Sequence, residues 1–178
     1  MYQHVVHRTS FENLEEMIRE YFGLNVRFRD IHAFKSLMAE YYRPTYMSLI
    51  KKLAYGHLIH TDETEIKLKK SKGYVWVFTS LEEVVFMYKP TREGEFLREW
   101  LGDYKGVLVS DFYGAYDSMS CPQQKCLIHL MRDLNNDILK NPFDEELKGL
   151  AQEFALLLRP MIETVDRCGL KAHFLCKH

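Results

Sequence analysis

Two short apolar runs in this chain each end at an aspartate. Residues 106–109 are followed by Ser110 and Asp111, and residues 58–61 are followed by Asp62. Short apolar runs of this kind are typical of buried strands, and open α/β sheets place their chemistry at the carboxyl ends of strands. An aspartate there is also a common helix cap. The repetition of the pattern, rather than either case alone, favours a site built from Asp62 and Asp111.

Composition limits the classes of protein that fit. A chain of 178 residues suits one domain with a sizeable core. No apolar run approaches the ~18 residues that a membrane helix needs, and the first residues lack the apolar region of a signal peptide, which predicts a cytoplasmic protein without membrane contact. The net charge of −1 gives no global case for nucleic-acid binding, so any such site has to be a local patch.

The pattern of predicted helices and strands divides the chain into three segments. These are a helical lead-in over residues 1–54, an α/β core over residues 55–140 and a helical segment over residues 141–178.

In the lead-in, Ser10 is the expected N-cap of a first helix and Gly23 its expected stop. A second helix is expected over residues 31–41, and Pro44 is expected to break it. The short connection at residues 23–29 makes these helices candidates for DNA binding, although ordinary packing on the sheet is the favoured interpretation.

The sequence of the α/β core predicts secondary-structure elements in the order β-β-β-α-β. The expected elements are strands over 58–61, 74–79 and 84–88, a helix over 91–101 and a strand ending at Asp111. The unbroken apolar run at 74–79 predicts burial on both faces. A right-handed crossover returns the fourth strand parallel to the first, which gives the spatial order 3-2-1-4 and brings Asp62 and Asp111 side by side.

Two carboxylates so placed repel each other unless a cation lies between them. Hard divalent ions such as Mg²⁺ accept carboxylate oxygens, and a pair of such ions supports phosphodiester chemistry. No phosphate-binding glycine motif is present. The arrangement therefore favours cleavage of a nucleic-acid backbone over nucleotide binding.

Four motifs occur together in a fixed order. They are H-x-D-E-T at 60–64, W-V-F at 76–78, S-D-F-Y at 110–113 with Tyr116, and C-x-x-H-x-x-R-D at 126–133. Over roughly residues 53–139 the chain resembles the catalytic domain of DDE transposases of bacterial insertion sequences, in the family of insertion sequence 66.

The resemblance implies an RNase H-like mixed sheet and Mg²⁺-dependent cleavage and transfer of DNA strands, with Mn²⁺ able to substitute. It implies Asp62 and Asp111 as the first two catalytic, metal-binding acids. Element ends and target DNA are the implied partners, in the nucleoid of a bacterial cytoplasm, and assembly into a homo-oligomer is left open.

One departure concerns the third acid of that family, a glutamate in a context like N-x-A-E-R, which does not occur before His178. The glutamates at 145, 146, 153 and 163 have the spacing of a solvated helix face within a helical stretch at 143–165, interpreted as the start of an insertion. The chain is therefore expected to be a transposase fragment that ends before its triad is complete, with weak metal binding and no assured catalysis of its own.

A basic run offers the expected DNA phosphate contacts. Its members are Lys67, Lys69, Lys70 and Lys72, and Arg132 is a further candidate. Such runs are usually solvated hairpins, but next to a nuclease site this one is the best candidate for phosphate binding.

Cys126 and His129 share a helix face and are expected near the site as structural residues, together with Tyr113. Zinc bound with Cys121 would lack a fourth good ligand, so a packed cysteine and a hydrogen-bonding histidine are favoured. The tail from Cys168 to His178 is rich in potential ligands but is interpreted as a frayed terminus. Glu63 is expected on the strand face opposite Asp62.

Two other classes of function stay open. A different RNase H-like nuclease predicts cleavage without strand joining and a complete set of acids within the chain. A catalytically inactive DNA-binding relic predicts no turnover even with Mn²⁺.

Overall fold

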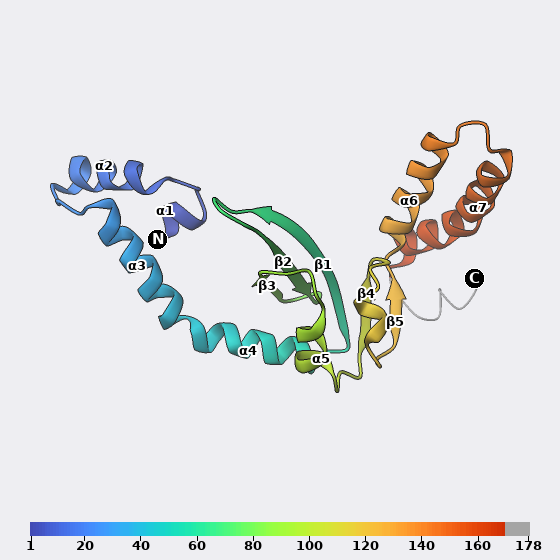
Figure 1. The fold of residues 1–178 in the computed structure, drawn as a ribbon, viewed down its shortest axis with the longest axis horizontal. Helices are drawn as coiled ribbons and strands as arrows, with labels where there is room; N and C mark the ends of the chain where they lie inside the picture. The colour runs from blue at the N-terminus through green and yellow to red at the C-terminus, as the bar shows by residue number, and fades with distance from the viewer. Residues whose placement is uncertain (170–178) are drawn as a thin grey trace.

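A mixed five-stranded sheet forms the centre of the molecule, with a helical arm on either side (Figure 1). The computed structural model describes residues 1–169. The elements are α1 (Tyr2–Val5), α2 (Phe11–Phe22), α3 (Phe28–Tyr41), α4 (Arg43–Ala54), β1 (Leu58–Lys67), β2 (Lys72–Thr79), β3 (Val84–Lys89), α5 (Glu95–Leu101), β4 (Val107–Ser110), η1 (Tyr116–Ser118), β5 (Gln123–Lys125), α6 (Leu127–Lys140) and α7 (Glu145–Cys168).

The helical lead-in follows its end signals. The Ser10 side chain accepts a hydrogen bond from the backbone of Asn13, and Gly23 ends α2 in the left-handed conformation with φ 64°, where a residue without Cβ is favoured. Pro44 lies in the first turn of α4, a position that tolerates proline because its N–H would have no partner in the helix.

The sheet has the strand order β3-β2-β1-β4-β5. The pairs β1–β2 and β2–β3 are antiparallel, whereas β1–β4 and β4–β5 are parallel. The predicted order 3-2-1-4 is confirmed. The fifth strand was not predicted, because its sequence, Gln-Gln-Lys, carries no apolar run.

Strand β1 is longer than expected, and this changes the position of Asp62. The strand was predicted to end at Thr61, but its antiparallel pairing with β2 continues to Lys67. Asp62 therefore lies inside β1 rather than after it. Only the parallel pairing with β4 stops earlier, at His60, so Asp62 does lie just beyond the paired part of that edge.

Helix α5 is shorter than expected. The prediction of a helix from residue 91 is wrong, because the helix begins at Glu95 after Gly94. The preceding residues form a non-helical connection in which Arg92 reaches the side chain of Glu63.

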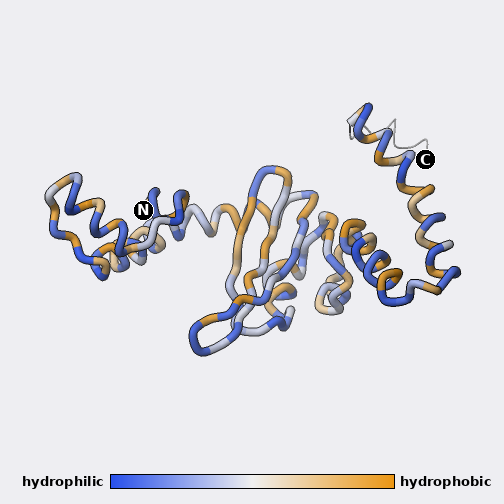
Figure 2. Tube along the Cα trace, turned by 90° about the horizontal axis from the view of Figure 1, so that it is seen from above, coloured by the Kyte–Doolittle hydropathy of each residue, from blue (hydrophilic) through white to orange (hydrophobic). Residues whose placement is uncertain are grey.

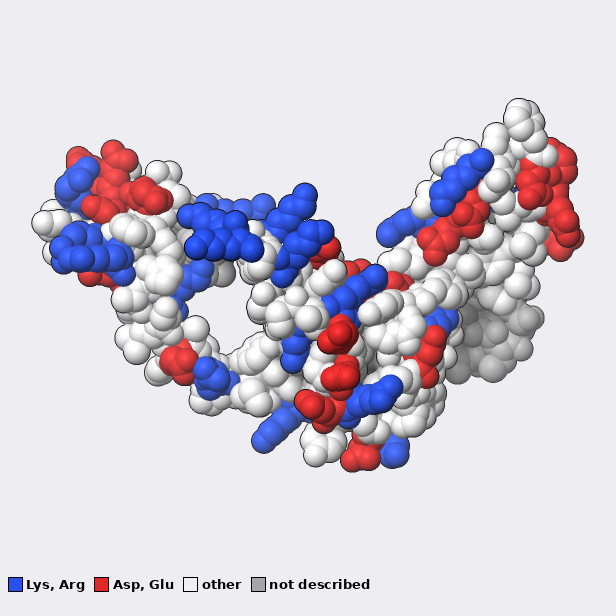
Figure 3. Space-filling view, viewed as in Figure 1, with Lys and Arg blue, Asp and Glu red and all other residues white. Residues whose placement is uncertain are grey.

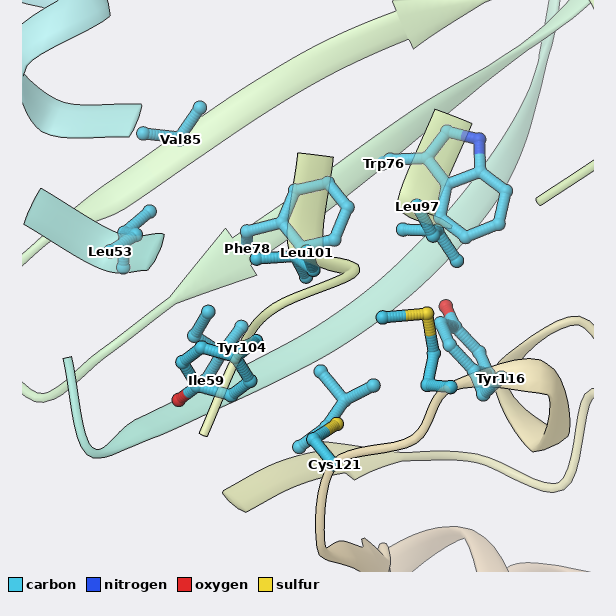
Figure 4. Packing of buried hydrophobic residues seen from close by; sticks show 12 residues of the cluster. Leu53, Ile59, Trp76, Phe78, Val85, Leu97, Leu101, Tyr104, Tyr116 and Cys121 are labelled. Atoms are coloured by element: carbon cyan, nitrogen blue, oxygen red, sulfur yellow. The ribbon is translucent and has the colours of Figure 1, made fainter. Parts of the chain in front are cut away.

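The core lies between one face of the sheet and the segment containing α5 and η1 (Figure 4). Trp76, Phe78 and Tyr116 are each fully buried there, and the Trp76 and Tyr116 rings meet edge to face at 5.9 Å. Burial of such aromatic rings provides a large apolar contribution to stability.

The opposite face of the sheet is more open. Val75 and Val77 of β2 are only half-buried, and Phe86, which pairs with Val77, has an exposed fraction of 60%. Within residues 1–169 the prediction of full burial on both faces of this strand is therefore wrong. The same face carries Asp62, which pairs with Val77.

The two helical arms extend away from the sheet in different directions (Figure 2). In the arm formed by α6 and α7, Asp144 is the N-cap of α7, and its side chain accepts a hydrogen bond from the backbone N–H of Leu147. The four glutamates of α7 discussed above are all exposed, as their spacing predicts. No helix within residues 1–169 has the length and apolar character to cross a membrane.

Candidate functional site

Asp62 lies within β1, and Asp111 directly follows β4, the strand that pairs parallel with β1. The register pairs Ile59 with Leu108 and His60 with Val109. Continued by two residues, the same register sets Asp62 opposite Asp111. Asp62 alternates with Glu63 along β1 and so projects to the face opposite the Trp76 core. Asp111 follows the last residue of β4 and lies within electrostatic reach of Arg92 and Tyr116. Asp62 is exposed and Asp111 is half-buried.

Local hydrogen bonds orient each carboxylate. Oδ1 of Asp62 accepts from the backbone N–H of Glu63 at 2.9 Å, and Oδ1 of Asp111 accepts from the backbone N–H of Tyr113 at 2.9 Å. Each bond uses one of the two oxygens of its carboxylate. These bonds limit the side-chain freedom that a bound cation would otherwise have to restrict.

Helix α6 begins beside the end of β4. The backbone N–H of Cys126 donates to the carbonyl of Ser110 at 2.7 Å, which places the first turn of α6 next to the proposed acids. The neighbouring Cys126 thiol raises the pKa of His129, and the Asp62 carboxylate raises it further. His129 is thus within electrostatic reach of Asp62.

The cysteines differ in environment. Burial alone would raise the pKa of Cys126, but interactions with the backbone and side chain of His129 lower it overall. Cys121 is buried in the core, and burial raises its pKa. No group of three or more His, Cys, Asp or Glu side chains able to hold a metal occurs among residues 1–169. Most of the ligand-rich tail, residues 170–178, lies outside the described residues.

Glu63 projects to the core face, as its alternation with Asp62 predicts. Its side chain has an exposed fraction of 1%. Arg92 Nη2 donates to its Oε1 at 2.6 Å, and the Tyr116 hydroxyl donates to its Oε2 at 2.5 Å. We call Glu63, Arg92, Tyr113 and Tyr116 the Glu63 cluster. Burial, followed by the hydrogen bond to Glu63, raises the pKa of Tyr116 far above its ordinary value, so its hydroxyl stays protonated and keeps donating.

The basic run forms the end of the β1–β2 hairpin. Lys67 pairs with Lys72 across the two strands, and the backbone N–H of Leu68 donates to Ser71 to close the turn. Lys and Arg side chains gather at this end of the sheet in Figure 3. Lys72 is partly neutralised by an ion pair with Glu65 at 3.0 Å. Arg132 is exposed on α6.

Sequence reasoning missed two features of the site region. Arg92 gave no signal, because an isolated arginine before a predicted helix has no distinguishing pattern. Tyr116 was noted in a motif, but its burial against Glu63 was not. The spacing of Glu63 from Asp62 was the only available indication that a second carboxylate would lie on the core face.

The mixed sheet with the strand order β3-β2-β1-β4-β5 has the fold class of an RNase H-like protein. The family model described as Transposase IS66 family matches residues 1–173. The chain belongs to this family of transposases. A search among curated proteins gives no match.

Among solved structures, the chain is similar to the HTLV-2 integrase catalytic core domain in complex with magnesium. For the trimeric form the identity is 16%, the match covers 56% of this chain and 82% of that chain, and the TM-score is 0.34. For the dimeric form the values are 16%, 53%, 81% and 0.32.

A chain of the simian T-cell lymphotropic virus intasome in complex with PP2A regulatory subunit B56 gamma is 14% identical. The match covers 56% of this chain and 48% of that chain, with a TM-score of 0.34. The chain thus spans about half the length of this protein. The similarities are low, and the class assignment rests on the strand order and on the family.

Proposed function

We propose that Asp62 and Asp111 of this chain are two metal-binding acids of a DDE transposase, which carries out divalent-metal-dependent cleavage and transfer of DNA strands. The observation that supports the proposal is the parallel β1–β4 register, whose last pair, His60 and Val109, lies two residues before each acid. Membership of the transposase family gives this pair of acids its reaction class.

The donors fit a hard divalent cation. Both side chains offer carboxylate oxygens, which are the ligands that Mg²⁺ and Mn²⁺ prefer. When bound, such an ion supplies positive charge that activates an attacking oxygen and stabilises a leaving one. The residues of this chain contribute the placement: the sheet fixes the two backbones, and the backbone N–H groups of Glu63 and Tyr113 orient the carboxylates.

DNA is the proposed partner, and the β1–β2 hairpin is its proposed phosphate contact. Lys67, Lys69 and Lys70 are exposed at the hairpin end, together with Lys72. Clustered lysines bind phosphates without reading sequence. The hairpin extends from the same strand that carries Asp62, so a duplex bound along it approaches the proposed acids.

Fe²⁺-directed cleavage tests the metal site and the DNA contact without requiring turnover. Fe²⁺ replaces Mg²⁺, and ascorbate with peroxide generates hydroxyl radicals that cut chains near the ion. We expect cuts in the protein backbone near residues 62 and 111, and cuts in a bound DNA duplex. Both sets should vanish in Asp62→Asn and in Asp111→Asn and persist in Glu153→Gln, an exposed residue of α7.

Protein cuts elsewhere, or cuts unchanged in Asp111→Asn, would contradict the assignment of the metal ligands. Protein cuts at the expected positions without cuts in bound DNA would contradict a role for this metal in DNA chemistry. DNA binding with no metal-directed cuts would favour the inactive DNA-binding relic.

A further inference from the structure

We infer that Glu63 is a positioning residue for the proposed site: its buried carboxylate, acting through Arg92 and Tyr113, fixes the turn that presents Asp111 beside Asp62. The inference rests on the proposed function, because the role given to Glu63 is the placement of one of the two proposed acids. Glu63 itself projects away from them and is not a metal ligand.

The first step is that the Glu63 carboxylate requires its partners. Its side chain has an exposed fraction of 1%, against 44% for Arg92. Arg92 Nε and Nη2 both donate to Oε1, at 2.9 and 2.6 Å, and the Tyr116 hydroxyl donates to Oε2. A buried carboxylate without such partners is strongly unfavourable. Glu63 therefore determines where Arg92 and Tyr116 can lie.

The second step leads from Arg92 to Asp111. The guanidinium of Arg92 lies over the ring of Tyr113, with its Cζ 4.0 Å from the ring centroid, a favourable cation–π contact. The Tyr113 hydroxyl donates to the backbone carbonyl of Arg92 at 3.1 Å. The backbone N–H of Tyr113 in turn donates to Oδ1 of Asp111 at 2.9 Å.

The third step is that the turn after Asp111 is held at two points. Tyr113 is held by Arg92, and Tyr116 is held by the Glu63 carboxylate directly; their rings meet edge to face at 6.1 Å. On the other side, the backbone N–H of Glu63 donates to Oδ1 of Asp62. A single residue of β1 thus contacts one proposed acid directly and reaches the other through Arg92 and Tyr113.

The same strand supplies a matched comparison. Glu65 lies two residues further along β1, pairs with Lys72 at 3.0 Å and accepts a hydrogen bond from the Tyr74 hydroxyl at 3.3 Å. Glu63 and Glu65 are thus the same residue type on the same strand. Each has one basic partner and one tyrosine partner, but these partners are different residues. Glu65 is more exposed, at 37%, and its partners lie on β2 rather than in the turn after Asp111.

The test compares Glu63→Gln with Glu65→Gln by two measurements. Amide hydrogen exchange read by NMR reports the Tyr113 N–H, which bonds Asp111, and it needs no metal. Electron paramagnetic resonance of free Mn²⁺ reports metal affinity. We expect Glu63→Gln to speed exchange at Tyr113 and to weaken Mn²⁺ binding by about tenfold, the lower end of the effect of outer residues that orient metal ligands. Glu65→Gln should change neither quantity.

Equal exchange and equal Mn²⁺ affinity in the two variants would overturn the positioning role and leave the proposed function standing, provided that Asp111→Asn still loses Mn²⁺ binding. If Asp111→Asn binds Mn²⁺ as the wild type does, the proposed metal site fails instead. The exchange of Tyr113 then decides by itself whether Glu63 positions the turn.

Arg92→Lys keeps the test decisive if Glu63→Gln does not fold. Lysine retains a charge for Glu63 but lacks the planar guanidinium that lies on the Tyr113 ring. Faster exchange at Tyr113 in a folded Arg92→Lys protein supports the inference, and unchanged exchange contradicts it.

Discussion

Asp62 and Glu63 are adjacent in β1, yet their carboxylates lie on opposite faces of the sheet. Asp62 is exposed, whereas the Glu63 side chain is buried against Arg92 and Tyr116. The alternation of a strand allows one acid to face a cation while its neighbour holds an ion pair within the core face. Two carboxylates next to each other in sequence therefore lie in different environments.

The hydroxyl of Tyr116 should contribute strongly to stability. Tyr116 is fully buried and donates to a buried carboxylate, and hydrogen bonds to charged groups contribute about 1.5–3 kcal/mol. We expect Tyr116→Phe to lower the free energy of unfolding by about that amount in urea denaturation. Tyr74→Phe is the control, because its hydroxyl bonds Glu65 at the surface; its loss should be about 0.5 kcal/mol or less. Equal losses would contradict the special role of the Glu63 cluster.

Cys126 should react with iodoacetamide before Cys121 does. The thiolate is the reacting form, so a lowered pKa gives Cys126 more of it at neutral pH, while burial raises the pKa of Cys121 and limits access. Peptide mass spectrometry at a series of pH values should give Cys126 the lower midpoint.

The variant His129→Ala should shift the Cys126 midpoint upward, because His129 lowers the pKa of that thiol. A midpoint that is unchanged in the variant would show that the histidine does not act on the cysteine.

The hairpin lysines should carry a large share of the salt dependence of DNA binding. Replacing Lys67, Lys69, Lys70 and Lys72 with alanine should weaken binding and reduce the slope of log affinity against log salt by up to about 3.6, since each phosphate contact adds about 0.9. Fluorescence anisotropy of a labelled duplex measures both quantities.

The control removes the same charge elsewhere. Lys51, Lys105, Lys140 and Arg167 are exposed and lie outside the hairpin. Their replacement by alanine should leave most of the slope intact. Equal effects of the two sets would assign the binding to net charge rather than to the hairpin.

Much of the fold could be predicted because its signals are local. The Ser10 cap, the Gly23 stop and the apolar runs of β2, β3 and β4 each act within a few residues, and the handedness of the crossover then fixes the strand order. The three-residue strand β5 could not be predicted in this way. It is polar, and its pairing depends on the neighbouring edge of β4.

The site was predictable in part for the same reason. The parallel pairing of β1 with β4 follows from the crossover and could be expected, whereas the pairing of Asp62 with Asp111 stays a prediction. The role of Arg92 could not, because it depends on a contact with a residue 29 positions away. Arg92 lies in the non-helical connection before α5. Helical periodicity alone placed these residues in the helix and so predicted a helix that begins too early.

The central claim is that Asp62 and Asp111 share one divalent ion, and thermal melts with and without Mn²⁺ test it most directly. An ion that binds only the native state should stabilise the wild type by about 1–3 kcal/mol at concentrations up to ~100-fold above its dissociation constant. Asp111→Asn removes one ligand together with the repulsion between the two acids. It should melt higher than the wild type without metal and show no gain with Mn²⁺, while Glu153→Gln should match the wild type in both conditions. A full Mn²⁺ response in Asp111→Asn would contradict the account.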